Sequence, residues 1–139
     1  MAAKQADPDC TVIGGCLWTV QFTRELEKIF DLGGLDYMDI YSYHAYGTLE
    51  RSLEQELDAR ALKGKVKDKY GRDLRVWMTE GGIVSWPFLP SVLGADVQSA
   101  PVPLFRYDKA CEALARIYLK ALAYGNEKFF YYYLGYPLA

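Results

Sequence analysis

Residues 74–82 read LRVWMTEGG and carry the clearest structural signal in the sequence. Its first residues are too apolar for a strand with one wet face, which is typical of a parallel sheet covered by helices. A helix is predicted before it, because apolar side chains recur at helical spacing over residues 49–70. Gly71 stands between the two, where a helix end needs a left-handed residue. The segment therefore predicts a helix, a turn and a buried parallel strand.

The same pattern of helix, glycine and strand occurs three times. The predicted helices span residues 22–30, 49–70 and 107–124, and the strands after them span 35–44, 74–80 and 128–134. A fourth strand is predicted over residues 11–15, after a turn signal at residues 7–9. Right-handed crossovers that join parallel strands lead to a barrel or to a doubly wound sheet.

Alignment of the repeats places chemistry-bearing residues at one end of the sheet. His44, Glu80 and the tyrosines of residues 131–133 fall at equivalent depths, near the C-terminal ends of three neighbouring strands. That is the face where α/β barrels hold their active sites. The long, aromatic connection over residues 81–106 is predicted to form a wall or lid of a pocket. Trp86 within it either stacks on a ligand or packs inside the connection.

Composition limits the classes of function. A hydrophobic share of 51% and a charged share of 24% are typical of a globular domain. A net charge of -2 argues against nucleic-acid and membrane-surface partners. No apolar run is long enough to span a bilayer, and the first residues lack the pattern of a signal peptide. The three cysteines show no CxxC spacing, so we expect buried free thiols and no zinc site.

The motif WMTEGG (residues 77–82) resembles the strand-7 nucleophile motif of retaining (β/α)8 glycoside hydrolases, in the large clan of cellulase-like and β-xylosidase-like families. Residues 6–15 resemble strand 5 of that barrel. Residues 35–47 resemble strand 6 with its His-x-Tyr end, and residues 115–132 resemble the last helix and strand 8. The resemblance implies an α/β fold that forms part of a (β/α)8 TIM barrel, with about four parallel strands. Residues 1–139 would then be the C-terminal half of a catalytic barrel.

The resemblance also implies a chemistry. Glu80 would be the nucleophile in double displacement on a β-linked glycan or glycoside, without a metal or organic cofactor. A second carboxyl group, about 5–5.5 Å away, would act as acid and then as base. In the clan that residue is a Glu after an Asn, at the end of strand 4. The only Asn-Glu in this chain, Asn126-Glu127, precedes a predicted strand and so lies at the wrong end. The acid/base is therefore expected from the missing N-terminal half of the barrel.

Further substrate-binding residues follow from the same comparison. His44 and Tyr46 match the strand-6 end, where a group hydrogen-bonds the nucleophile or a sugar hydroxyl. A lone histidine is also a common core residue, so a packing role for His44 stays open. Tyr131 and Tyr133 hold the place where many relatives put a Trp under the sugar. Strand alternation allows only some of these tyrosines to face the pocket.

Two other functions remain open at the level of sequence. One is a non-catalytic carbohydrate-binding protein, in which Glu80 accepts hydrogen bonds from a sugar. The other is a different TIM-barrel enzyme that uses Glu80 as a general base for proton abstraction. The second would be expected to show a phosphate loop or clustered metal ligands, and the sequence shows neither.

Overall fold

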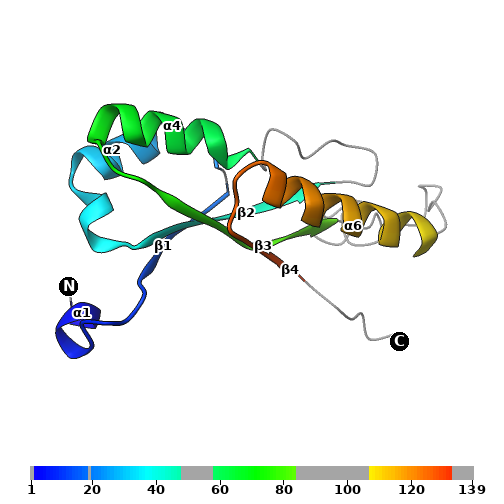
Figure 1. Cartoon of the computed structure of the whole chain (residues 1–139), viewed down its shortest axis with the longest axis horizontal. Coiled ribbons are helices and arrows are strands. Elements are labelled where there is room, and N and C mark those ends of the chain that lie inside the picture. The colour runs from blue at the N-terminus through cyan, green and yellow to red at the C-terminus, as the bar shows by residue number, and fades with distance from the viewer. Residues whose placement is uncertain (1, 19, 48–57, 84–106, 133–139) are drawn as a thin grey trace, which may run out of the picture.

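The computed structural model describes residues 2–18, 20–47, 58–83 and 107–132. These residues form a four-stranded sheet in which neighbouring strands follow chain order and every pair is parallel (Figure 1). The strands are β1 (Ile13–Leu17), β2 (Ile40–Gly47), β3 (Arg75–Ile83) and β4 (Lys128–Tyr131). The predicted α/β class with four parallel strands is confirmed. The closure of such a sheet into a barrel remains a prediction.

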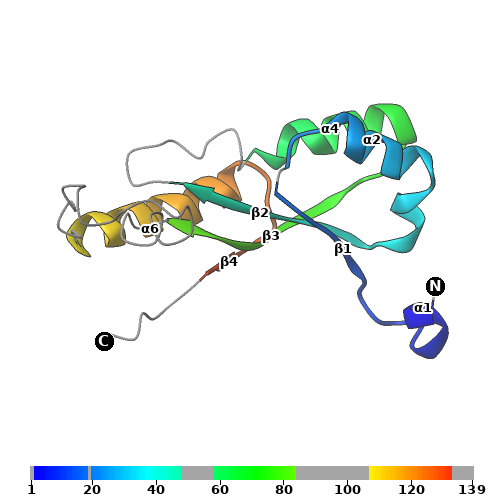
Figure 2. The same ribbon diagram turned by 180° about the vertical axis from the view of Figure 1, so that it is seen from behind.

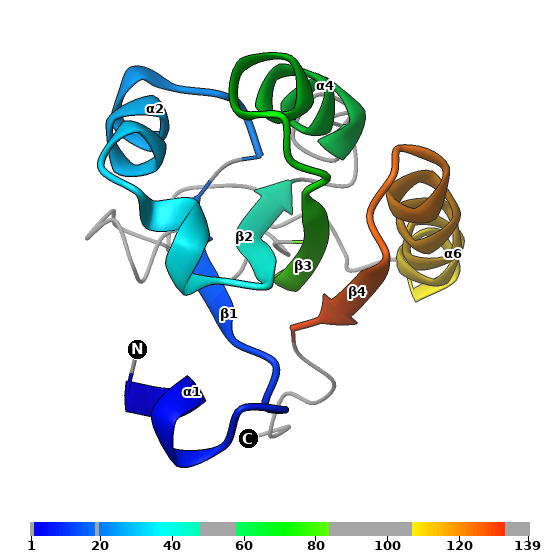
Figure 3. The same cartoon turned by 60° about the vertical axis from the view of Figure 1, so that its left-hand side comes forward.

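Three of the helices cover one face of this sheet. The helices are α1 (Ala2–Ala6), α2 (Arg24–Asp31), α4 (Ala59–Tyr70) and α6 (Tyr107–Ala123), with a short 3-10 helix η1 (Gly34–Tyr37). Figure 3 shows α2, α4 and α6 arrayed around one face, while the opposite face carries none of them. Helix α1 lies apart from the sheet, beyond the start of β1 (Figure 2). We call the first face the covered face and the second the open face.

The hydrophobic core lies between the covered face and the helices. Its strand residues alternate along β2 and β3, and all four are 0% exposed: Tyr41, Tyr43, Val76 and Met78. The helices contribute buried pairs four residues apart: Leu26 with Phe30, Leu62 with Val66, and Ile117 with Ala121. Such pairs share one side of a helix. The predicted apolar stripes therefore pack against every second residue of the strands.

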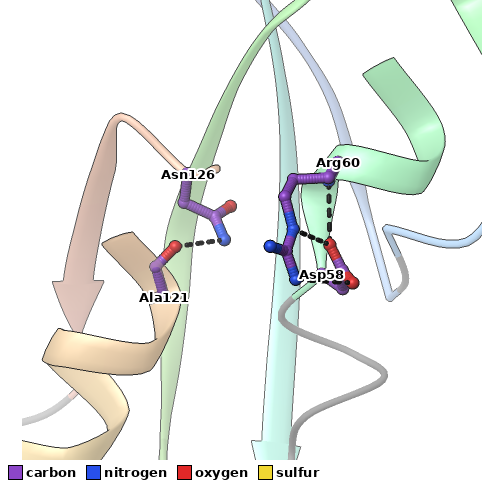
Figure 4. Close-up of polar contacts among 4 residues, drawn as sticks. All are labelled: Asp58, Arg60, Ala121 and Asn126. Atoms are coloured by element: carbon purple, nitrogen blue, oxygen red, sulfur yellow. Dashed lines mark hydrogen bonds and ion pairs between the residues drawn. The ribbon is translucent and has the colours of Figure 1, made fainter. Parts of the chain in front are cut away.

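The ends of helices α4 and α6 meet on the covered face. The Asp58 carboxylate caps α4 by accepting a hydrogen bond from the Arg60 amide at 3.0 Å (Figure 4). The Arg60 guanidinium lies 5.0 Å from the centre of the Tyr124 ring, just after the end of α6. The Asn126 side-chain amide donates to the Ala121 carbonyl at 3.0 Å and fastens the turn into β4 (Figure 4). The positive end of one helix dipole thus faces the negative end of the other, which is favourable.

Several predicted boundaries are wrong at the start of β2 and β1. The strand predicted from residue 35 begins only at Ile40, because residues 34–37 form η1. Gly33 is left-handed with a φ of 85°, and its carbonyl accepts a hydrogen bond from the Asp36 amide at 3.0 Å. This turn places Leu35 in the core. Strand β1 covers residues 13–17 and not 11–15.

Other predictions are confirmed only in part. Helix α4 is the second part of the helix predicted over residues 49–70, and the part before residue 58 lies outside the described residues. The predicted end of the last strand, at residues 133–134, also lies outside them. The three cysteines are free thiols, as predicted. They are not buried, since Cys16 and Cys111 are exposed and Cys10 is half-buried.

Candidate active site

A β-bulge in β3 sets the direction of Glu80. Tyr43 of β2 pairs with Met78, but the next residue, His44, pairs with Glu80, so Thr79 is an extra residue. Strict alternation from Met78 would turn Glu80 toward the helices. The bulge shifts the alternation by one residue and turns Glu80 to the open face, level with His44.

The two glycines after Glu80 belong to strand β3. The strand was predicted to end at Glu80, but β3 continues to Ile83. A Cβ atom on Gly81 would lie 2.6 Å from the Ala45 carbonyl oxygen, and one on Gly82 would lie 2.7 Å from that of Tyr132. The glycines therefore allow both neighbouring chain segments to approach β3 closely beside Glu80.

The Glu80 carboxylate is held by two side chains of β2. The Tyr46 hydroxyl donates a hydrogen bond to Glu80 Oε1. His44 Nδ1 lies 3.8 Å from Glu80 Oε2. Burial, and then the hydrogen bond to Glu80, raise the pKa of Tyr46 well above its usual value. Tyr46 therefore stays neutral and keeps its proton for this hydrogen bond at any physiological pH.

Two more aromatic residues complete the group: Trp18, which the sequence did not indicate, and Tyr132, which belongs to the predicted tyrosine cluster but was not chosen within it. Trp18 follows β1, and its ring centre lies 6.0 Å from that of Tyr46 and 6.4 Å from that of His44. Tyr132 follows β4, and its ring meets Tyr46 edge to face at 6.5 Å. The C-terminal ends of all four strands thus contribute to one cluster, which we call the Glu80 cluster: Trp18, His44, Tyr46, Glu80 and Tyr132.

The remaining predicted residues are not brought to this cluster. Tyr131 packs against the hydrophobic core, with its ring edge-on to Phe129 at 6.4 Å. The alternation of β4 gives the contact with Tyr46 to its neighbour, Tyr132. Trp86 and Tyr133 lie outside the described residues.

Next to the Glu80 cluster, toward the N-terminal ends of the strands, the open face carries two more aromatic side chains. The rings of Trp77 and Phe130 lie 6.0 Å apart, and the Lys128 ammonium group lies 4.3 Å from the centre of the Trp77 ring.

The Ser42 hydroxyl accepts a hydrogen bond from the Cys16 amide at 3.1 Å and donates one to the Gly14 carbonyl at 3.0 Å. Ser42 is therefore fully satisfied although it is buried.

A small pocket of about 110 Å³ lies at the other end of the strands. Its charged side chains pair with one another: Lys4 with Asp39 at 2.9 Å, and Arg72 with Asp36 at 2.7 Å. The pocket is the junction between α1, η1 and the N-terminal ends of the strands, and these charges are already paired within the protein. The residues suited to chemistry gather instead at the C-terminal ends of the strands.

Within the described part of the chain, no three His, Cys, Asp or Glu side chains are grouped so that they could hold a metal ion. None of the helices in that part has the length and apolar character needed to cross a membrane.

Comparison with known proteins gives no family for this chain. No model of a protein family, no curated protein and no solved structure matches it.

Proposed function

We propose that the chain is the C-terminal half of a (β/α)8-barrel glycoside hydrolase, and that Glu80 is the nucleophile in retaining hydrolysis of β-linked sugars. One observation carries the proposal. Glu80 lies on the open face of an all-parallel sheet, near the C-terminal strand ends, with one oxygen hydrogen-bonded to Tyr46, whose ring contacts those of Trp18 and Tyr132. Aromatic faces bind the apolar faces of sugar rings, and a carboxylate among them suits attack at an anomeric carbon.

The one-sided helix layer supports the barrel. Helices α2, α4 and α6 cover a single face, and the other face presents Trp77, Phe130 and the Glu80 cluster. In a (β/α)8 barrel every helix lies outside, and the inner face is filled by side chains from all eight strands. Four strands in chain order are half of that number. The missing partner in this proposal is the N-terminal half of the barrel.

The reaction follows from the contacts of Glu80. Tyr46 holds Oε1, so Oε2 is the atom that attacks the anomeric carbon and forms a glycosyl-enzyme ester. The bond to the leaving oxygen breaks with its electron pair, and that oxygen takes a proton from the acid/base carboxyl group of the N-terminal half. Water, deprotonated by the same group, then attacks the anomeric carbon and releases Glu80. The Glu80 carboxylate also stabilises the positive charge that develops on the sugar.

The experiment uses substrates that do not need an acid catalyst. In 2,4-dinitrophenyl β-glucoside and β-xyloside the leaving group departs without protonation, so release of dinitrophenolate reports on the nucleophile. We expect Glu80→Ala to slow release by roughly a thousandfold or more. Sodium azide should restore release and give the α-glycosyl azide, because azide attacks from the side that Glu80 vacates. Glu112→Ala, an exposed carboxylate on α6, is the matched control.

Equal release by the unaltered chain and by Glu80→Ala would contradict the proposal.

The Glu80 cluster also suits a carbohydrate-binding protein without catalysis, because aromatic rings and a hydrogen-bond acceptor are enough to bind a sugar. Such a protein would bind the glycosides and release no dinitrophenolate, with or without azide.

A further inference from the structure

The open face of the sheet carries two adjoining groups of aromatic rings. The ring of Tyr46 contacts those of Trp18 and Tyr132, at 6.0 and 6.5 Å between ring centres. Phe130 stands two residues before Tyr132, on the same side of the chain, and its ring lies 6.0 Å from that of Trp77. Helices α2, α4 and α6 lie on the other face and leave these rings uncovered (Figure 3). An apolar surface of this kind marks a site where another molecule binds.

The exposed apolar side chains of the sheet belong to its two outer strands. Within the described ranges, the large apolar residues that are exposed in a strand or directly after one are Ile13 (42%), Trp18 (76%), Phe130 (46%) and Tyr132 (56%). They come from β1 and β4 alone. Ile13 pairs with Ile40, the neighbour of the core residue Tyr41, so alternation turns Ile13 to the open face as well.

The area of this surface approaches what a stable complex needs. An aromatic side chain offers about 150–250 Å² for burial, so the exposed fractions of Trp18, Phe130 and Tyr132 leave about 270–450 Å² open. Each partner in a stable complex buries roughly 800 Å². These three side chains therefore supply about a third to a half of that area, before Ile13 and the strand edges are counted.

The edges of the sheet indicate which partner fits. Among the described residues, β1 pairs only with β2 and β4 pairs only with β3, so each outer strand keeps one unpaired edge. The strands are parallel and follow chain order, so β4 of one copy can lie parallel to β1 of another. Two such contacts, related by a two-fold axis, give eight parallel strands without a free edge. A second copy of the chain meets both requirements, an apolar face and two complementary edges.

The charges at the starts of the outer strands agree with this pairing. Lys128 begins β4 and is exposed, whereas the exposed carboxylates Asp7 and Asp9 precede β1. Parallel pairing of β4 with β1 of a second copy brings these opposite charges to the same end of the sheet. Opposite charges across an interface favour the correct partner and register.

We propose that the open face binds a second copy of this chain, in a two-fold symmetric pair in which β4 of each copy lies beside β1 of the other. Phe130 of one copy and Ile13 of the other then share the interior of a closed barrel. The inference goes beyond the proposed function and does not depend on Glu80 as a nucleophile.

Sedimentation velocity over about 1–100 µM tests the association. The unaltered chain is expected to sediment as a dimer at the upper end of this range. Phe130→Glu should raise the dissociation constant about 100-fold or more, because the dimer would bury an unpaired carboxylate in each of its two contacts. Ile13→Lys, on the other outer strand, should act in the same way. Leu119→Glu is the matched control, since Leu119 is 70% exposed on α6, and it should leave the dimer unchanged.

Two outcomes would overturn the inference. A chain that stays monomeric at about 100 µM would leave the N-terminal half of the barrel as the occupant of the open face. A dimer that neither Phe130→Glu nor Ile13→Lys weakens would be held together by another surface. Circular dichroism should show that both variants remain folded.

Hydrogen exchange measured by mass spectrometry tests the pairing of the outer strands. Amides of β1 and β4 should exchange more slowly in the dimer than in the Phe130→Glu monomer, because their free edges become hydrogen-bonded. Amides of α2 are the internal control and should exchange equally in both. Equal exchange of β1 and β4 in dimer and monomer would overturn the pairing of β4 with β1.

Failure of this inference and failure of the proposed function give different results. Association is measured without any sugar, whereas release of dinitrophenolate depends on Glu80. A dimer that releases no dinitrophenolate keeps the second copy and removes the catalytic role. Glu80-dependent release by a monomer keeps the catalytic role and removes the second copy.

Discussion

The two faces of the sheet are built from the same strands and carry different kinds of residue. On the covered face Tyr41, Tyr43 and Met78 are removed from water. On the open face, between and beside them in the chain, stand His44 and Glu80, which keep partial access to water. Neighbouring residues of one strand therefore serve different purposes, because their side chains leave the strand in opposite directions.

The difference shows how a strand carries stability and chemistry together. Burial of each large apolar side chain on the covered face contributes about 1.5–3 kcal/mol. A carboxylate there would lose its hydration without gaining a partner, at a much larger cost. The bulge at Thr79 keeps Glu80 out of that environment and places it beside Tyr46, which donates a hydrogen bond to it.

The largest effect is expected from a cavity on the covered face. Met78→Ala should lower the free energy of unfolding by about 2–5 kcal/mol, because Met78 is completely buried among helix residues. His44→Ala is the control on the open face, because His44 follows directly on Tyr43, which pairs with Met78. It should lower the free energy of unfolding by less than about 1 kcal/mol. Urea unfolding followed by circular dichroism measures both. Equal losses of stability in the two variants would contradict the difference in burial between the two faces.

Gly81 tests whether close approach of the strands is needed beside Glu80. Gly81→Ala should lower the free energy of unfolding by about 1–3 kcal/mol, because its Cβ atom would collide with the backbone of β2. Gly64→Ala in α4 is the control, since a Cβ atom there meets nothing within 4 Å. It should raise stability by about 0.5–1 kcal/mol through its helix propensity. A Gly81→Ala chain as stable as the unaltered one would show that β2 and β3 do not need glycine there.

A substitution of Tyr46 tests the hydrogen bond to Glu80 on the open face and leaves the buried core unchanged. Tyr46→Phe removes the hydrogen bond to Glu80 and should slow dinitrophenolate release about 10–100-fold, the worth of one hydrogen bond to a charged group. Tyr37→Phe, at the other end of the strands, is the control for loss of a hydroxyl group. Unchanged release by Tyr46→Phe would mean that this hydrogen bond does not position the nucleophile.

A separate effect is expected at alkaline pH. Burial is the main cause that raises the pKa of Tyr41, Tyr43 and Tyr46 above the ordinary value of 10.0. A raised pKa in the folded state gives stability that is complete below the unfolded pKa and is lost as the pH rises above it. The free energy of unfolding should therefore be insensitive to these groups at pH 8 and fall above about pH 10. Urea unfolding at pH 8, 10 and 11 measures this, and greater stability at pH 11 would contradict the burial of these tyrosines.

Much of the fold was predictable because its signals are local. The glycine that ends each predicted helix and the apolar strand after it gave the element order and the parallel sheet. The equivalent depth of His44 and Glu80 was predicted by counting residues after the glycines, and their pairing in the sheet confirms it. The start of β2 was predicted wrongly because Leu35, Tyr37 and Met38 resemble the apolar residues of a strand, while the left-handed Gly33 bends residues 34–37 into η1.

The parts of the site that were missed depend on contacts between distant segments. The bulge at Thr79 is a register shift between two strands and leaves no mark in the alternation of β3 alone. Trp18 looked like an ordinary residue after a strand until the sheet placed it beside Tyr46. The choice of Tyr132 over Tyr131 depends on which residue of β4 pairs with Gly81. The one available signal was an aromatic residue near the end of the first and of the last predicted strand, Trp18 and Tyr132.

Trapping a sugar on Glu80 as a covalent intermediate tests most directly whether Glu80 is the nucleophile. A 2,4-dinitrophenyl 2-deoxy-2-fluoro-β-glycoside carries a good leaving group, and its fluorine slows the second step, so a covalent glycosyl-enzyme accumulates. Mass spectrometry of the intact chain and of its peptides should show one added fluorosugar on the peptide that contains Glu80. The same adduct should be absent from Glu80→Gln. An adduct on a different carboxylate, or hydrolysis of the parent glycoside without any adduct on Glu80, would contradict the role of Glu80 as nucleophile.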